Sequence, residues 1–70
     1  MLITNQHGEF ECSNDIFESA HDFVVLQQKM GKPTKFYWLV KKLANYHHLS
    51  QAEGKVLAHH VLNAVPEFVD

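Results

Sequence analysis

Apolar residues recur with helical spacing in three stretches of the chain. In the middle stretch, Phe36, Leu39, Val40, Leu43 and Tyr46 fall on one side of a helix when each residue turns by about 100°. This spacing predicts a helix over about residues 34–47 with that side facing the core.

The first stretch follows Ser13 and precedes Gly31, which are typical residues for the start and the end of a helix. It predicts a helix over about residues 14–30. The apolar face comprises Ile16, Phe17, Ala20, Phe23, Val24 and Met30. Val25 falls on the opposite side and is therefore an apolar residue displaced from the core face.

The third stretch opens with the strongest local signal, since Ser50 and Glu53 have the spacing of a capping box. It predicts a helix over about residues 50–65 that Pro66 ends. Gly54 costs about 1 kcal/mol within a helix and is tolerable there if another backbone must approach closely. Residues 66–70 are expected to fold back as a short packed tail through Phe68 and Val69.

The N-terminal residues follow a different period. Phe10 and Cys12 alternate with Glu9 and Glu11 after a turn-like segment, which predicts a β-hairpin over about residues 2–12. The pattern as a whole predicts a mainly α protein, in which this hairpin precedes a compact three-helix domain. Residues 1–70 are expected to form one small domain.

A chain of 70 residues has a marginal core unless a disulfide, a metal or oligomerisation supplements it. One cysteine excludes an intramolecular disulfide and favours a reducing compartment. No apolar run is long enough for a membrane span, and no signal pattern opens the chain. We therefore expect a cytoplasmic protein that makes no membrane contact, and a homodimer.

Charge is distributed unevenly along the chain. Residues 1–31 carry five acids against one lysine, and residues 32–60 carry five lysines against one glutamate, within a total net charge of -2. Arginine is absent. Its absence argues against a surface that reads phosphates or bases, because arginine supplies the bidentate contacts.

Trp38, the only tryptophan, lies roughly 200° around its helix from Phe36, among lysines. An aromatic residue within a polar rim is typical of an interface centre. The predicted partner-binding residues are Trp38, Tyr37, Lys35, Lys41, Lys42 and Val25. Alternatively, Trp38 packs beneath the hairpin or the tail, or lies beneath lysine stems.

Residues 43–57 (LANYHHLSQAEGKVL) offer a second interpretation. They resemble the turn and the recognition helix of a helix-turn-helix protein, which implies DNA contacts from Ser50, Gln51 and Lys55. His48 replaces the usual turn glycine, and Gly54 stands where a β-branched core residue is usual. A plain helical hairpin has the same spacing, so nucleic acid is the less favoured partner.

The histidines form two doublets, at positions 47–48 and 59–60. Adjacent helix positions point about 100° apart, so neither doublet can chelate a metal, and paired histidines give only a third, weaker interpretation. Cys12 has no recognisable base, and no glycine-rich phosphate loop exists. We expect no metal, cofactor, small-molecule substrate or enzymatic activity. The preferred hypothesis is a non-enzymatic protein-binding module, acting as an adaptor, inhibitor or regulator.

Overall fold

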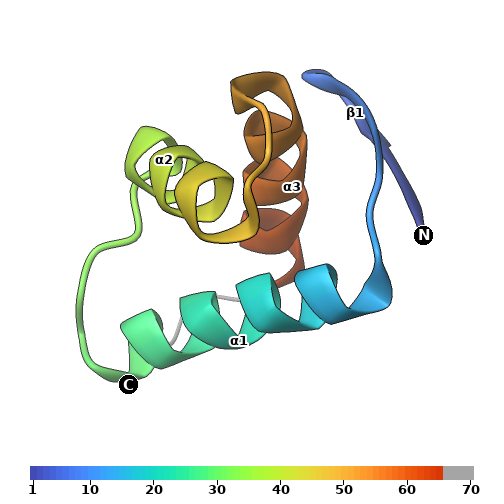
Figure 1. The fold of residues 1–70 in the computed structure, drawn as a ribbon. Helices are drawn as coiled ribbons and strands as arrows, with labels where there is room; N and C mark the ends of the chain where they lie inside the picture. The colour runs from blue at the N-terminus through green and yellow to red at the C-terminus, as the bar shows by residue number, and fades with distance from the viewer. Residues whose placement is uncertain (66–70) are drawn as a thin grey trace.

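The computed structural model of the chain describes residues 1–65 (Figure 1). Two strands precede three helices: β1 (Leu2–Asn5), β2 (Gly8–Glu11), α1 (Asn14–Lys29), α2 (Phe36–His47) and α3 (Gln51–Ala64). This order confirms the predicted hairpin and three-helix architecture. The expected tail at residues 66–70 lies outside the described residues.

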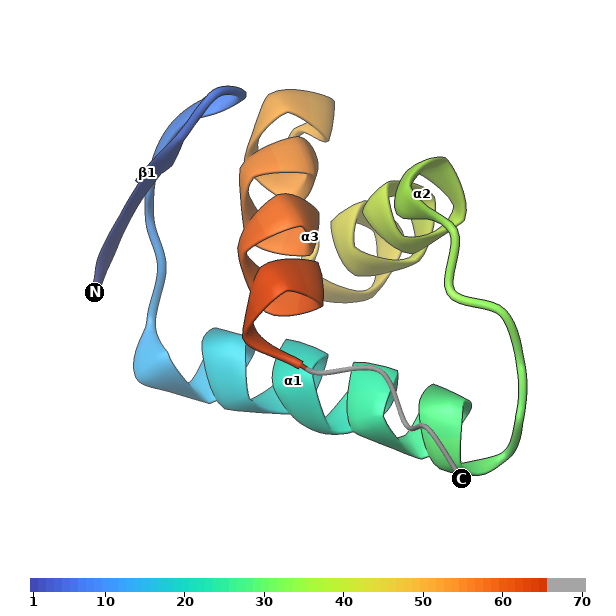
Figure 2. The same cartoon turned by 180° about the vertical axis from the view of Figure 1, so that it is seen from behind.

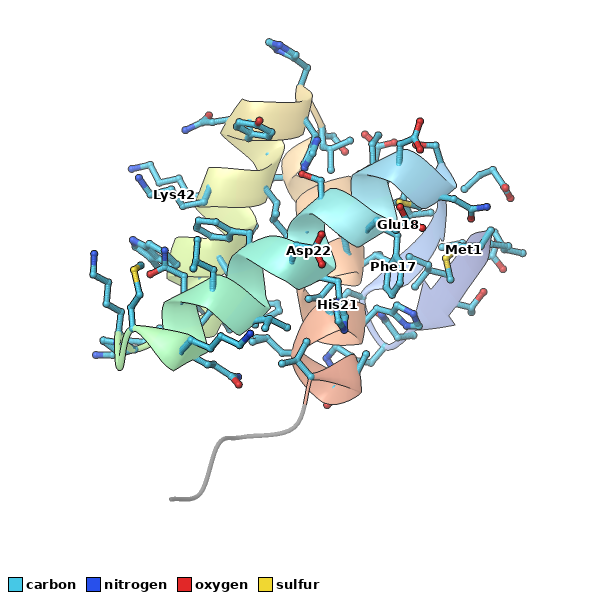
Figure 3. All side chains as sticks on the ribbon, turned by 90° about the horizontal axis from the view of Figure 1, so that it is seen from below. Met1, Phe17, Glu18, His21, Asp22 and Lys42 are labelled. Carbon is cyan, nitrogen blue, oxygen red and sulfur yellow. The ribbon has the colours of Figure 1, made fainter. Side chains whose placement is uncertain are left out.

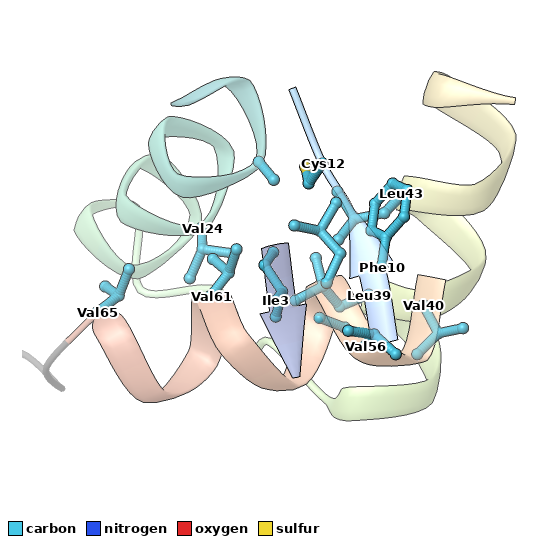
Figure 4. Close-up of a cluster of buried hydrophobic side chains, with 13 residues drawn as sticks. Ile3, Phe10, Cys12, Val24, Leu39, Val40, Leu43, Val56, Val61 and Val65 are labelled. Carbon is cyan, nitrogen blue, oxygen red and sulfur yellow. The ribbon is translucent and has the colours of Figure 1, made fainter. Parts of the chain in front are cut away.

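Helix α3 is the centre of the molecule. The hairpin, α1 and α2 each pack on it, from three sides (Figures 1 and 2). The buried side chains between these elements form one core (Figure 4). Its members are Ile3, Phe10, Cys12, Ala20, Val24, Leu39, Val40, Leu43, Val56, Leu57, Ala58, Val61 and Val65.

The hairpin is attached to α3 through both its core face and its turn. The strands are antiparallel, and Ile3 pairs directly with Phe10, so that both side chains enter the core. The Asn5 side-chain amide donates a hydrogen bond to the Val56 carbonyl oxygen over 3.0 Å. A two-stranded hairpin is unstable alone, and α3 supplies the surface that it needs.

Helices that have a capping side chain begin close to where the sequence predicts. Ser13 accepts a hydrogen bond from the backbone N–H of Ile16 and caps α1. Ser50 and Glu53 form the complete predicted capping box of α3, with bonds of 2.9 and 3.1 Å. Helix α2 has no capping side chain and begins at Phe36, two residues later than predicted.

Gly54 lies at the crossing of α2 and α3. A Cβ atom at this position would lie 3.2 Å from the Val40 carbonyl oxygen and 3.3 Å from Val40 Cγ1. The close approach of another backbone, which the sequence suggested for this glycine, is therefore present. It brings α2 tightly against α3.

Candidate functional site

Trp38 lies on the side of α2 that faces α1, away from the hairpin. Its ring stacks on that of Phe23 from α1, with centroids 5.8 Å apart and planes 20° from parallel. Lys42 Nζ lies 5.8 Å from the centre of the indole, a distance typical of a cation–π contact. The Trp38 side chain still keeps 38% of its surface exposed, so neither Phe23 nor Lys42 covers it fully.

A first hollow of about 330 Å³ opens on one side of this stack. It is lined mainly by apolar surface, with Lys42 on the α2 side and Asp22 on the α1 side (Figure 3). The complete lining is Ser19, Asp22, Phe23, Leu26, Lys42, Leu43, Tyr46 and His47. Helices α1 and α2 both pack closely on α3, whereas they approach each other less closely and meet through the Phe23–Trp38 stack.

A second hollow of about 310 Å³ lies on the other side of the stack, where the connector enters α2. Gln27, Lys32, Pro33, Lys35 and Trp38 line it. Since Phe23 belongs to the first hollow and Trp38 to the second, the stacked rings stand between them. We call the two hollows and the intervening stack the α1–α2 groove.

The predicted partner-binding residues divide between three places. Trp38, Lys35 and Lys42 line the α1–α2 groove. Tyr37 and Lys41 line a separate depression with Asn45 and Gln51 on another side of α2.

Val25 is half-buried and packs against the core, so its predicted displacement from the core is wrong. The broad apolar arc of α1 extends farther round the helix than the sequence pattern suggested.

Three groove residues were missed as site candidates, or were assigned to the core. Tyr46, which the sequence placed on the core side of its helix, is 76% exposed. Leu26 is 52% exposed at the rim of the first hollow, and His47 is half-buried within it. Met30, also assigned to the core, is exposed. Phe23, Leu26 and Met30 have i, i+3, i+7 spacing on α1. This spacing was the sequence signal that could have indicated an apolar row beside the groove.

The charges around the groove are mostly positive. Lys32, Lys35 and Lys42 line it, against Asp22 as the one carboxylate among its lining residues. Burial lowers the pKa of His47 below its ordinary value, and the adjacent His48 lowers that pKa further. His47 is therefore largely neutral at neutral pH and adds a polar but uncharged group to the first hollow.

The residues of the DNA-binding alternative lie along a helix with little free surface. Ser50 uses its hydroxyl as the α3 cap, Gln51 is exposed and Lys55 is half-buried. No residue of α3 between positions 53 and 62 is fully exposed. A recognition helix must instead lay one face into the major groove. His48 does adopt the left-handed turn conformation (φ 57°), which fits a plain helical hairpin equally well.

The histidines are involved in aromatic packing. His7, in the hairpin turn, stacks on Phe36 and meets His59 edge-on, with ring centroids 5.0 and 5.1 Å away. His60 lies against Phe17. Both His59 and His60 are half-buried. Within residues 1–65, no three His, Cys, Asp or Glu side chains converge as metal ligands.

Cys12 is a core residue. Its side chain is buried, and the Sγ atom donates a hydrogen bond to the Ser13 carbonyl oxygen. Burial raises the pKa of the Cys12 thiol, which disfavours the reactive thiolate. The geometry therefore fits a structural thiol rather than a nucleophile.

Comparisons of the chain with family models, with curated proteins and with solved structures gave no match. No helix in the described part of the chain has the length and apolar character required to cross a bilayer. The α1–α2 groove is thus the feature on which a functional argument can rest.

Proposed function

We propose that this protein is a small non-enzymatic protein-binding module that uses the α1–α2 groove to bind another protein. The observation that carries the proposal is the group of partly exposed apolar side chains beside two hollows. Leu26, Trp38 and Tyr46 offer their surface to solvent at the place where α1 and α2 separate. Large apolar and aromatic groups around a concavity are typical of interface hot spots.

The polar residues around the groove support the same proposal. Interfaces commonly combine an apolar centre with a charged rim, and here lysines surround Trp38 and the hollows. An adaptor, inhibitor or regulator acts by such binding alone. A cytoplasmic location belongs to this proposal and is supported by the one cysteine of the chain, which is a free thiol.

Capture of partners with matched surface variants tests the proposal. Leu26→Glu places a carboxylate beside the first hollow, whereas Tyr37→Glu places one on the separate depression of α2. Both parent side chains are exposed, at 52% and 71%, so both variants should fold. Far-UV circular dichroism checks this.

We expect at least one protein from an extract of the source cells to bind the wild type and Tyr37→Glu but not Leu26→Glu. Quantitative mass spectrometry of the captured proteins gives the comparison. If every captured protein is retained by Leu26→Glu, the groove is not the binding surface and the proposal fails.

A further inference from the structure

We infer that the α1–α2 groove accepts an amphipathic helix with an acidic end, supplied by another protein. This inference rests on the proposed function and specifies the partner. Two helices that diverge above a shared third helix leave a trough with helical walls. An amphipathic helix can fill such a trough with its apolar face.

The length of the groove sets the length of this helix. Its α2 wall extends over the whole helix, Phe36–His47, whose twelve residues at 1.5 Å each span about 18 Å. A partner helix lying along this wall therefore contacts it over about twelve residues, or just over three turns.

The two hollows set the spacing of the apolar anchors. Trp38 marks the second hollow and Tyr46 the first, eight residues apart on α2, or about 12 Å along its axis. A helix that lies parallel or antiparallel to α2 fits one large apolar residue in each hollow when the two are separated by seven or eight positions. The residue between them, at i+3 or i+4, lies over the stacked Phe23 and Trp38 rings.

The charges distinguish the two ends of the partner helix. The second hollow has Lys32 and Lys35 and no acidic lining residue, whereas the first hollow contains both Lys42 and Asp22. Carboxylates on the partner helix are therefore attracted most strongly beside the second hollow. A helix whose acidic residues lie at that end fits the groove best. Such an arrangement also fixes the direction in which the helix lies.

A second copy of this chain fits the groove less well. A symmetric dimer formed through the groove would pack two mostly positive linings against each other, which is a repulsive arrangement. A head-to-tail contact could use the exposed acids Asp15 and Glu18 of α1. That contact is heterologous, and it would give rings or open chains rather than a symmetric dimer.

A designed peptide tests the inference directly. The probe is a helical peptide of about fifteen residues with leucines at positions i, i+4 and i+7, glutamates at one end and no tryptophan. The control peptide has lysines in place of those glutamates. Because the protein has one tryptophan, the change in indole fluorescence on titration reports binding beside Trp38.

We expect the glutamate peptide to bind at least about tenfold more tightly than the lysine peptide at low salt, with a preference that shrinks as salt rises. Lys35→Glu, which reverses one charge of the second hollow, should reduce or reverse the preference. Lys41→Glu, on a different side of α2, should leave it unchanged. Comparable effects of the two variants would show a general charge effect and overturn the inference.

Other outcomes separate this inference from the proposed function. Equal binding of both peptides, or binding of neither, overturns the acidic helix, even if a protein partner is captured in the manner described above. Light scattering that reveals self-association abolished by Leu26→Glu overturns it in favour of a second copy. Failure of the capture experiment alone would refute the proposed function, whatever the peptides show.

Discussion

Replacing Gly54 by alanine tests whether α2 and α3 meet as closely as the structure shows. The added Cβ would lie 3.2 Å from the Val40 carbonyl oxygen, 3.3 Å from Val40 Cγ1 and 3.5 Å from Ala44 Cβ. The carbonyl oxygen belongs to the backbone of α2 and cannot rotate away, so the two helices must separate by a few tenths of an ångström.

Two opposing contributions set the size of the effect. Alanine gains about 1 kcal/mol over glycine from its intrinsic helix propensity. Overpacking a tight core contact costs roughly 1–3 kcal/mol. The net effect is that Gly54→Ala should lower the free energy of unfolding by about 1 kcal/mol, within a range from no change to about 2 kcal/mol. Gly54→Val adds two further methyl groups at the same contact and should lower the free energy of unfolding by clearly more.

Urea unfolding followed by far-UV circular dichroism measures these differences. Ala52→Gly is the matched control, because Ala52 lies exposed in the first turn of the same helix. This control should lose up to about 1 kcal/mol through propensity alone. If Gly54→Ala is instead stabilised by about 1 kcal/mol, the helices separate without cost and the argument from close approach is refuted.

Three further predictions concern the cap, the thiol and the groove histidine. Ser50→Ala should lower the free energy of unfolding by about 1 kcal/mol, because it removes one half of the α3 capping box; equal stability in urea would contradict this. The buried Cys12 thiol, with its raised pKa, should react with a maleimide far more slowly in the folded protein than in urea; equal rates would show that it is accessible. The lowered pKa of His47 means that the folded state binds fewer protons than the unfolded state. The free energy of unfolding should therefore fall as the pH drops from about 7 toward 5, and His47→Gln should flatten that dependence in urea unfolding repeated across this range.

Local signals predicted the elements of the fold. The capping box spans four consecutive residues, from Ser50 to Glu53, and the alternating pattern of the hairpin also spans only a short segment. Neither signal depends on the rest of the chain. The start of α2 was the least accurate boundary. Lys35 precedes that helix in an extended conformation without a side-chain cap, and the sequence offered no signal for the end of the connector.

The faces of α2 were harder to predict, because they depend on how the helices cross. Tyr46 and Leu43 share a side of the helix by periodicity, yet Leu43 is buried and Tyr46 is largely exposed. Tyr46 instead lines the first hollow. Trp38 was identified correctly as lying off the core side of α2, but its contact with Phe23 required the position of α1.

The position of the groove follows from the central place of α3. The hairpin, α1 and α2 divide the surface of this one helix between them, and the tight crossing at Gly54 holds α2 against it. Helices α1 and α2 are thereby kept apart, and the Phe23–Trp38 stack joins them across the gap. A fourth helix would complete this arrangement by covering the apolar sides of both. The packing of the whole domain therefore favours an external helix, and the lysines around Trp38 indicate what charge that helix should carry.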